Sequence, residues 1–348
     1  MAESLKKQSN GDRLNGGLRL AIPSDGEMFE PTQRFLEHCG MAINRPSARR
    51  YTASVPTIEG LEVIFQRTAD ITSKVEDGNA DLGMVGRDRF QESRIQGGDT
   101  VVIIPELGFG RCELVVATPD AWMDVDSMAD LADLAVEFRE SGRDLRVATK
   151  YPRLVSRFFF SHGVNYFSIA SVTGTLEASV AMGYADLIVD ITASGVTLRE
   201  NRLKRLEDGT VLASEGALIG NKKLLRENPE RLEGAREIIE RIEAHRNAGD
   251  FQRISVNIEG SSEEAVAAKV LERPECAGLQ GPTIARVYTT DGRKWYSVTV
   301  FVNKVSLTSL VDFFRAIGGV SVTVSGASYV FGQESSSYAT LLAELGLS

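Results

Sequence analysis

The stretch Asp190–Leu198 has the residue types of an anion-binding turn. It follows the apolar run Leu187–Val189, which predicts a buried strand that ends in a carboxylate. Ser194 and Thr197 supply hydroxyl donors, and Gly195 lets the backbone come close to a ligand. A helical pattern begins where the stretch ends. The amides of such a turn and the positive end of the following helix converge on one point, which predicts a phosphate cradle.

The carboxylate of Asp190 suits sugar hydroxyls, because it would repel a phosphate. The stretch is therefore interpreted as a phosphate cradle beside a ribose clamp. An alternative remains open from the local pattern, since Ser and Thr side chains commonly cap helices by accepting hydrogen bonds from free amides.

The length and composition of the chain limit the number of domains and the classes of molecule that it can bind. A chain of 348 residues predicts two to three domains, and 43% hydrophobic with 25% charged residues is ordinary for a globular protein. The net charge of −9 argues against general binding to nucleic acid or to an anionic membrane. The three widely spaced cysteines, an odd number without a C-x-x-C pair, indicate reduced thiols and no metal framework: Cys39, Cys112 and Cys276.

Residues 1–17 are polar and carry no apolar core, so they are neither a signal peptide nor a membrane span. We interpret them as a disordered leader of a cytoplasmic protein.

Strands and helices alternate from Leu18 to Ile219, as in an α/β domain with mostly parallel sheets. The pattern Gly78-x-Ala80-Asp81-Leu82 returns as Gly183-x-Ala185-Asp186-Leu187. The echo predicts two similar lobes with a cleft between them, although Gly-x-Ala-Asp could also be a common helix-to-strand turn.

The last hundred residues predict a separate module. A charged helix over Pro229–Asn247 and a linker at Ala248–Asp250 lead into it. The order β-α-β-β-α-β is that of a ferredoxin-like domain, with a hairpin turn at Thr290–Gly292. The module has no obvious catalytic residues, so we expect a role in regulation or assembly.

Signatures of hydrolytic and metal enzymes are absent from the sequence. The histidines His38, His162 and His245 fall in separate predicted helices. Gly108-Phe109-Gly110 lacks the third glycine of a dinucleotide fingerprint and precedes a strand.

Taken together, ordered motifs resemble the ATP phosphoribosyltransferase family in its long form. The phosphoribosyl-pyrophosphate loop of the family is similar to Asp190-x-x-x-Ser194-Gly195-x-Thr197-Leu198. Other matches follow in the family's order: Leu18–Pro23 with Gly26, Arg67-x-x-Asp70-Ile71, Gly78–Gly86, Leu107–Leu114, Arg146–Pro152, Gly174–Glu177 and Gly281–Ile284.

The resemblance implies an α/β fold with two periplasmic-binding-protein-like lobes, a cleft between them and a C-terminal ferredoxin-like domain. The expected limits are 18–112 with 213–248 for lobe I, 113–212 for lobe II with the phosphate loop, and 250–348 for the regulatory domain. The reaction joins N1 of the adenine of ATP to C1 of phosphoribosyl pyrophosphate and releases pyrophosphate, the first step of histidine biosynthesis. The resemblance also implies Mg²⁺ carried by the substrate phosphates, a homo-hexamer built from dimers, and feedback inhibition by histidine.

The resemblance also assigns residues. It places the 5′-phosphate on Ser194, Gly195, Val196 and Thr197, and the ribose hydroxyls on Asp190. Glu177 is a second candidate for the hydroxyls or for metal-bound water, and Arg67 is a further catalytic candidate. The candidates for the nucleotide or the pyrophosphate are Lys150, Tyr151, Asp70 and Gly86. A surface role stays open for Arg67, Lys150 and Tyr151.

One departure from the family lies in the turn after the first strand. The family commonly has a lysine and an arginine there, whereas this chain has Ser24–Glu27. Losing two cations beside phosphates costs several kcal/mol, at roughly 1.5–3 kcal/mol for each charge-assisted hydrogen bond, unless others replace them. The candidates to replace them are Arg49, Arg50, Arg87 and Arg111. Two alternatives follow: a non-catalytic bilobed sensor that keeps the cradle, and a phosphoribosyltransferase for another base.

Overall fold

The computed structural model describes residues 17–170, 176–290 and 292–347. Almost all of the expected leader, and the residues Gly174 and Thr175 of one motif, lie outside these ranges. The chain divides into two compact units, of which Ile238–Ser336 is the second. The first unit holds everything before it and also the last residues, 337–348.

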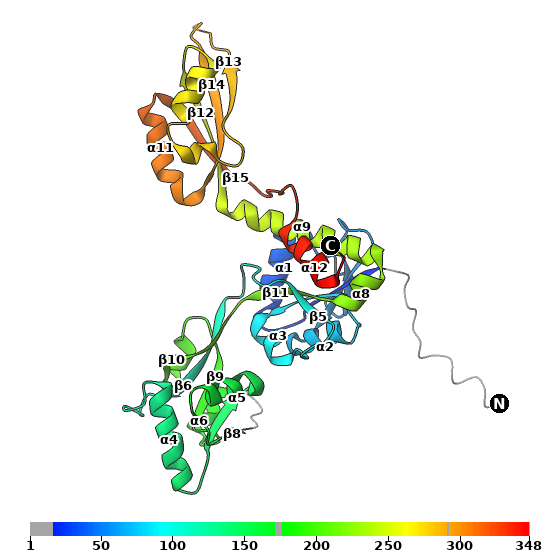
Figure 1. Cartoon of the computed structure of the whole chain (residues 1–348), viewed down its shortest axis with the longest axis vertical. Coiled ribbons are helices and arrows are strands. Elements are labelled where there is room, and N and C mark those ends of the chain that lie inside the picture. Colours follow the sequence, from blue (N-terminus) through cyan, green and yellow to red (C-terminus); the bar gives the residue numbers. More distant parts are fainter. Residues whose placement is uncertain (1–16, 171–175, 291, 348) are drawn as a thin grey trace, which may run out of the picture. The chain divides into compact units, whose positions relative to one another are not determined.

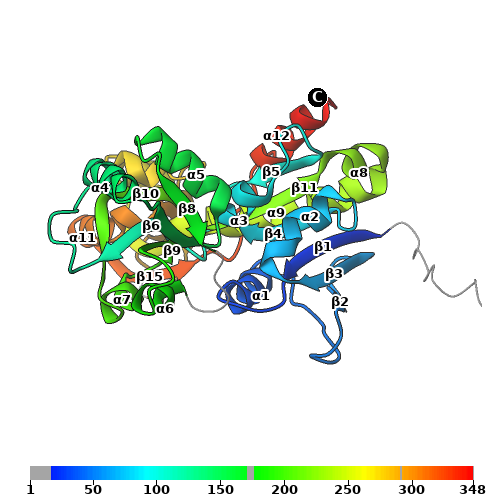
Figure 2. The ribbon, with the colours of Figure 1, turned by 90° about the horizontal axis from the view of Figure 1, so that it is seen from below.

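Lobe I of the first unit is built on a six-stranded sheet in the order β2-β3-β1-β4-β11-β5 (Figures 1 and 2). Strand β1 pairs in parallel with β3 and β4, while β11 runs antiparallel to β4 and β5. The elements are β1 (Leu18–Pro23), α1 (Phe29–His38), β2 (Thr52–Ser54), β3 (Leu61–Gln66), η1 (Thr68–Asp70), α2 (Ile71–Glu76), β4 (Leu82–Gly86), α3 (Arg87–Ser93), β5 (Thr100–Ile104), β11 (Gly216–Asn221) and α8 (Lys222–Glu227).

Lobe II is built on a five-stranded sheet in the order β10-β6-β9-β7-β8. Strand β7 pairs in parallel with β8 and β9, and β6 runs antiparallel to β9 and β10. The elements are β6 (Cys112–Pro119), α4 (Met128–Glu140), β7 (Leu145–Thr149), α5 (Pro152–Ser161), β8 (Phe167–Ala170), α6 (Leu176–Ala181), β9 (Leu187–Thr192), α7 (Val196–Glu200) and β10 (Leu203–Ser214).

Strand β9 is buried on both faces of the lobe II sheet. Because side chains alternate along a strand, Leu187 and Val189 join the core that α4 and α5 complete, whereas Ile188 joins a second core with Leu176 and Leu198. Asp190 follows at the next position on the Ile188 side. The buried apolar residues therefore hold β9 within the sheet, and the carboxylate of Asp190 lies near the end of this strand.

The second unit contains a four-stranded antiparallel sheet in the order β13-β14-β12-β15. With two helices on the core face, this is the expected ferredoxin-like arrangement, and Val256, Val298 and Phe314 lie in its core. The elements are β12 (Phe251–Glu259), α10 (Glu263–Val270), η2 (Pro274–Ala277), β13 (Thr283–Val287), β14 (Trp295–Asn303), η3 (Lys304–Ser306), α11 (Leu307–Ala316) and β15 (Gly319–Gly326). The fold class expected from the sequence, two α/β lobes and a C-terminal ferredoxin-like domain, is confirmed.

The predicted linker at Ala248–Asp250 is wrong. Helix α9 (Pro229–Asp250) continues through these residues and ends where β12 begins. Ala248 is a strong helix former and is only 3% exposed, so its burial stabilises a helical turn that Gly249 by itself disfavours. The second unit begins within this helix, at Ile238, and ends at Ser336, the first residue of α12 (Ser336–Leu345), whereas the expected range was 250–348.

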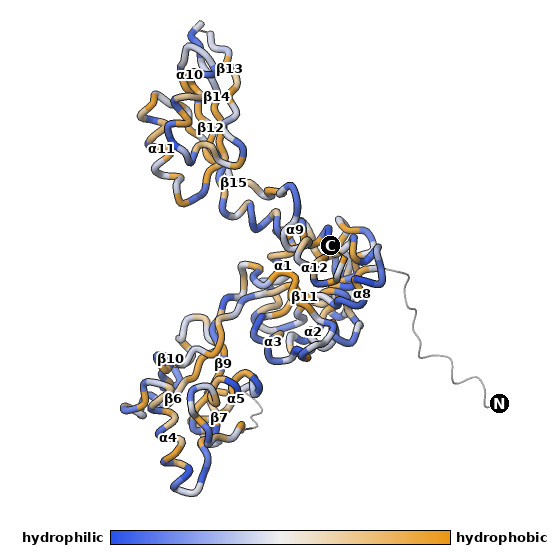
Figure 3. Tube along the Cα trace, in the orientation of Figure 1, coloured by the Kyte–Doolittle hydropathy of each residue, from blue (hydrophilic) through white to orange (hydrophobic). Residues whose placement is uncertain are grey.

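Apolar residues concentrate along the strands, as on β11, β12 and β14, while α8 is hydrophilic (Figure 3). Within the described ranges, every helix is too short or too polar to cross a lipid bilayer.

Candidate functional site

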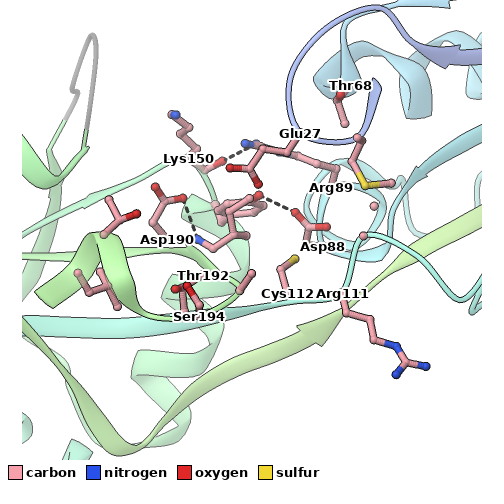
Figure 4. A pocket seen from close by; sticks show the side chains of 18 of the residues that line it. Glu27, Thr68, Asp88, Arg89, Arg111, Cys112, Lys150, Asp190, Thr192 and Ser194 are labelled. Atoms are coloured by element: carbon pink, nitrogen blue, oxygen red, sulfur yellow. Dashed lines mark hydrogen bonds between the residues drawn. The ribbon is translucent and has the colours of Figure 1, made fainter. Parts of the chain in front are cut away.

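A pocket of about 700 Å³ lies where the two lobes of the first unit face each other (Figure 4). Lobe II contributes the end of β9 with the turn that follows, the residues after β7, and one residue of α6. Lobe I contributes the turn after β1 and the start of α3. The lining residues that the argument uses are Glu27, Met28, Thr68, Gly86, Asp88, Arg89, Arg111, Cys112, Lys150, Tyr151, Glu177, Asp190, Ser194 and Thr197.

The turn predicted as a phosphate cradle borders this pocket. Ser194 and Thr197 line it and are exposed, so their hydroxyls are accessible to a ligand. Gly195 adopts φ 69°, a left-handed conformation that favours glycine, and its amide donates to Oγ1 of Thr192 over 2.9 Å. Helix α7 begins at Val196, earlier than expected, and is only five residues long. The cradle therefore depends more on hydroxyls and turn amides than on a helix dipole.

Asp190 is mostly buried at the wall of the pocket. Burial raises the pKa of its carboxyl, and the nearby Glu177 raises it further. The amide of Ile191, which donates to Oδ1 of Asp190 over 2.9 Å, and the charges of Lys150 and Arg89 act in the opposite direction. An acceptor in this position can bind two neighbouring hydroxyls of a ribose.

A buried network joins the lobes beside the pocket. The hydroxyl of Tyr151 donates to Oδ2 of Asp88 over 2.5 Å, and the hydroxyl of Ser214 donates to Oδ1 over 2.7 Å. Asp88 belongs to α3, Tyr151 precedes α5, and Ser214 ends β10. Burial and the adjacent Asp88 charge raise the pKa of the Tyr151 phenol. Tyr151 therefore stays protonated and serves as a hydrogen-bond donor.

Helix α5 of lobe II is capped by a residue of lobe I. Pro152 occupies the first helical position and has no N–H, and the next two amides, of Arg153 and Leu154, donate to the Glu92 carboxylate over 2.9 and 3.0 Å. The guanidinium of Arg153 donates in turn to the carbonyl oxygens of Glu92 and Arg94. These bonds fix the approach of α3 to α5 on one side of the pocket.

Most residues assigned from the sequence come together here, and some do not. Asp190, Glu177, Lys150, Tyr151, Gly86, Ser194 and Thr197 all line the pocket, and Gly195 and Val196 belong to the same turn. Arg67 and Asp70 are exposed at η1 and lie outside the lining. Sequence reasoning missed Asp88, Arg89 and Ser214, although Gly86-x-Asp88 directly after a buried strand is a position where functional side chains gather in α/β sheets.

Gly86 has a steric reason to be glycine. A Cβ atom at this position would lie 2.4 Å from Oδ1 of Asp88. We expect Gly86→Ala to displace the Asp88 carboxylate, to weaken its bonds to Tyr151 and Ser214, and to lower the free energy of unfolding by about 1–3 kcal/mol. Urea denaturation would measure the change. Gly249→Ala in the helix Pro229–Asp250, where a Cβ would meet no atom within 4 Å and φ is not positive, is the control and should not lower the stability. An unchanged unfolding midpoint for Gly86→Ala would contradict the network's role.

Nucleophilic chemistry finds little support in the pocket, and the described residues hold no dedicated metal cluster. Burial, with the Asp88 charge, raises the pKa of the Cys112 thiol to about 11, so it is a poor nucleophile. The three cysteines are unpaired, as expected. No group of three or more His, Cys, Asp or Glu side chains arranged for a metal ion occurs in the described part of the chain.

Known proteins resemble this chain closely. The family model described as "HisG: ATP phosphoribosyltransferase" matches residues 67–244, just over half of the chain. The chain is 36% identical over 336 residues to ATP phosphoribosyltransferase 1, chloroplastic, of Arabidopsis thaliana, covering 95% of this chain and 81% of the relative. It is 35% identical to ATP phosphoribosyltransferase of Bradyrhizobium sp., covering 95% and 99%. Among solved structures, the ATP phosphoribosyl transferase (HisG:HisZ) complex from Thermotoga maritima is similar with a TM-score of 0.50 and 25% identity, covering 65% of this chain and 98% of that one.

Proposed function

Given that the chain belongs to the ATP phosphoribosyltransferase family, and is therefore a pentosyltransferase of the first step of histidine biosynthesis, we propose that its interlobe pocket carries out the transfer. The observation that carries the proposal is the juxtaposition of the Ser194–Thr197 turn, the Asp190 carboxylate and the cations Lys150 and Arg89 around one cavity. A phosphate, a ribose and a leaving pyrophosphate need these three kinds of group in this order.

In the proposed binding mode, the hydroxyls of Ser194 and Thr197 hold the 5′-phosphate, with the amides of Gly195 and Val196 at the same turn. Asp190 accepts hydrogen bonds from the ribose hydroxyls. Lining residues of lobe I other than Arg89, which include Thr68 and Gly86, are left for the adenine nucleotide. The cavity thus orients both substrates, and holding them in place accounts for much of the catalysis.

The reaction breaks the bond from C1 to the pyrophosphate oxygen, whose electron pair leaves with the pyrophosphate. N1 of adenine forms the new bond to C1. Positive charge develops on the ribose as the leaving group departs, and the carboxylates of Asp190 and Glu177 are placed to stabilise it electrostatically. Neither residue has to act as a nucleophile. Arg67 and Asp70, which do not line the pocket, have no step in this scheme.

Mg²⁺ fits this pocket as a cation that the substrate carries. Magnesium keeps several waters and binds through one or two carboxylates together with substrate phosphates. Asp190 and Glu177 offer carboxylates at the cavity, and the described residues include no dedicated cluster of three. When bound, the cation neutralises charge on the departing pyrophosphate.

We also propose that the C-terminal ferredoxin-like domain senses histidine and that the protein is a homo-hexamer of dimers in the cytoplasm. The domain supports this role because it has its own core and lies outside the unit that holds the pocket. Light scattering of the purified protein would measure the oligomeric state, and a stable monomer would contradict the assembly.

A second candidate function is a bilobed sensor that binds nucleotides without turnover. One observation favours it, because Glu27 brings a negative charge into the lining where phosphates must bind. Calorimetry that detects ATP or histidine binding in a protein without turnover would support this candidate.

The test of the proposed function is pyrophosphate release from ATP, phosphoribosyl pyrophosphate and Mg²⁺. We expect release well above that of the double variant Asp190→Ala, Thr197→Val, which keeps the pocket but loses the ribose acceptor and one cradle hydroxyl. Release no faster than in this control would contradict the proposal. The mass of the product separates phosphoribosyl-ATP from the product of transfer to another base.

A further inference from the structure

The pocket contains a guanidinium that no carboxylate pairs with. Among the residues that the structure describes, none forms a salt bridge with Arg89. Arg89 lies in α3, and its Nη1 donates to the carbonyl oxygen of Lys150 over 3.2 Å. Its guanidinium carbon is 4.1 Å from the centroid of the Tyr151 ring. This cation is therefore placed in the cavity without a direct salt-bridge partner among the described residues, although it acts electrostatically on Asp190.

The other cations named from the sequence are placed differently. Arg111 lines the pocket, yet its guanidinium points away from Asp190 and pairs with Glu215 over 3.0 Å (Figure 4). Arg87 lines a neighbouring cavity with Glu106 instead. Arg49 and Arg50 are exposed in the segment before β2 and do not line the pocket. Of the two arginines that line the pocket, Arg89 is thus the one placed to meet a phosphate.

Stacking on Tyr151 leaves the edge of the guanidinium open. An arginine side chain has five N–H donors in a fixed plane, and one of its Nη1 donors is used by the Lys150 carbonyl. A planar fork of this kind matches two oxygens of a phosphate at once. The ring beneath adds a cation–π attraction that favours one orientation of the fork.

The ring beneath Arg89 is buried and held by hydrogen bonds. Tyr151 is fully buried, and its hydroxyl is held by Asp88, which Ser214 holds in turn. Arg89 and Lys150 line the same cavity as Asp190, the proposed acceptor of the ribose hydroxyls, and act on it electrostatically. The fork therefore borders the space that groups attached to that ribose would occupy.

We propose that Arg89 binds the pyrophosphate group of phosphoribosyl pyrophosphate, and that it supplies from α3 the positive charge missing from the turn Ser24–Glu27. This inference rests on the proposed function, because it takes the same pocket as the site of that substrate. Glu27 opposes the same phosphates with a negative charge, so the two side chains act in opposite directions on one ligand.

Calorimetry on the full-length protein tests the assignment, with inorganic pyrophosphate and Mg²⁺ as one probe and ribose 5-phosphate as the other. We expect Arg89→Gln to weaken pyrophosphate binding by about 10- to 100-fold, as expected for one or two lost charge-assisted hydrogen bonds. Ribose 5-phosphate, which uses the cradle and Asp190, should change less than threefold. Arg111→Gln, a lining cation that is already paired, should leave both affinities nearly unchanged. Arg89→Lys keeps the charge without the fork and should retain part of the affinity.

A second comparison separates a specific contact from net charge. Adding Glu27→Gln to Arg89→Gln restores the charge sum of the pocket, and we expect only partial recovery of pyrophosphate affinity. Complete recovery of the affinity would overturn the assignment of a specific contact to Arg89. The assignment would also fail if Arg89→Gln bound pyrophosphate within twofold of wild type, or if it lost the same affinity for both probes. It would fail as well if the wild-type protein bound no pyrophosphate. If wild-type protein binds pyrophosphate through Arg89 but releases none from the two substrates, the proposed function fails while the assignment of Arg89 stands.

Discussion

Asp190→Ala is expected to lower kcat/KM for phosphoribosyl pyrophosphate by about 100- to 10,000-fold. The lost carboxylate would remove two charge-assisted hydrogen bonds to ribose hydroxyls, each worth about 1.5–3 kcal/mol. It would also remove a negative charge beside the developing positive charge on the ribose. Steady-state kinetics with saturating ATP would measure the change. A loss below tenfold would contradict the assignment of Asp190 as the ribose acceptor.

The same variant should not destabilise the protein at neutral pH. Burial raises the pKa of Asp190 in the folded protein above that of the unfolded chain. Ionisation therefore costs folding free energy, and this cost appears as the pH rises through the window between the two pKa values. Above that window, Asp190→Ala should unfold at the same temperature as wild type or a higher one. A strongly lowered unfolding temperature would mean that Asp190 has a structural role instead.

The pH dependence of the activity can be tested with two variants that should shift it in opposite directions. Activity should fall on acidification as Asp190 takes up a proton, at a pH above the ordinary carboxyl range. Lys150 lowers the pKa of Asp190 and Glu177 raises it. Lys150→Gln should thus move the acidic limb to higher pH, and Glu177→Gln should move it to lower pH, whatever either variant does to the maximal rate. Two shifts in the same direction would show that another group controls the limb.

Sequence patterns predicted the elements whose apolar residues repeat regularly. Strand β9 was found because Leu187–Val189 are buried on both faces and end in a carboxylate, and the ferredoxin-like module because its strands alternate around a hairpin turn. Some elements were missed, and three of them, β8, α3 and α12, have a physical reason. Edge strand β8 has no fully buried residue, and α3 is short and charged around a single buried aromatic, Phe90. Helix α12 shows its role only through packing, since Leu341 and Leu345 are buried.

Some residues of the site could be predicted from the sequence, and others are brought together only by the fold. The cradle turn and Asp190 are contiguous in the sequence, so their chemistry could be read locally. The network around Asp88 could not, because Tyr151 and Ser214 lie 63 and 126 residues away from it. Arg89 has no recognisable motif either. Its role depends on the face of an aromatic ring that the other lobe supplies.

Removing the ferredoxin-like module without its flanking helices is expected to abolish inhibition by histidine and to leave catalysis within about threefold of wild type. A truncation after Ala248 is a poor test, because it also deletes α12. Residues 337–348 belong to the first unit, and Glu344 and Leu345 border a cavity with Lys222 and Arg226 of α8. Such a truncation would expose the apolar surface that α12 covers.

The sheet of the module offers a better junction. Gln252 of β12 and Gly326 of β15 are direct partners in the antiparallel ladder, so a short Asn-Gly turn can join them. Excision of residues 253–325 keeps all of α9 and also the returning segment, whose Val330 amide donates to the carbonyl of Ala244 over 2.9 Å. The first unit and its pocket then keep every element that the structure gives them.

Pyrophosphate release measured over a histidine titration would compare the excised protein with the full chain, and light scattering would report the assembly of each. The truncation after Ala248 is the control, and it should unfold at a lower temperature than the excised protein because it lacks α12. If the excised protein kept the histidine sensitivity of the full chain, the sensor would lie in the catalytic unit. Because the junction spares that unit, a loss of inhibition with intact turnover would place the sensor in the removed residues rather than in a damaged active site.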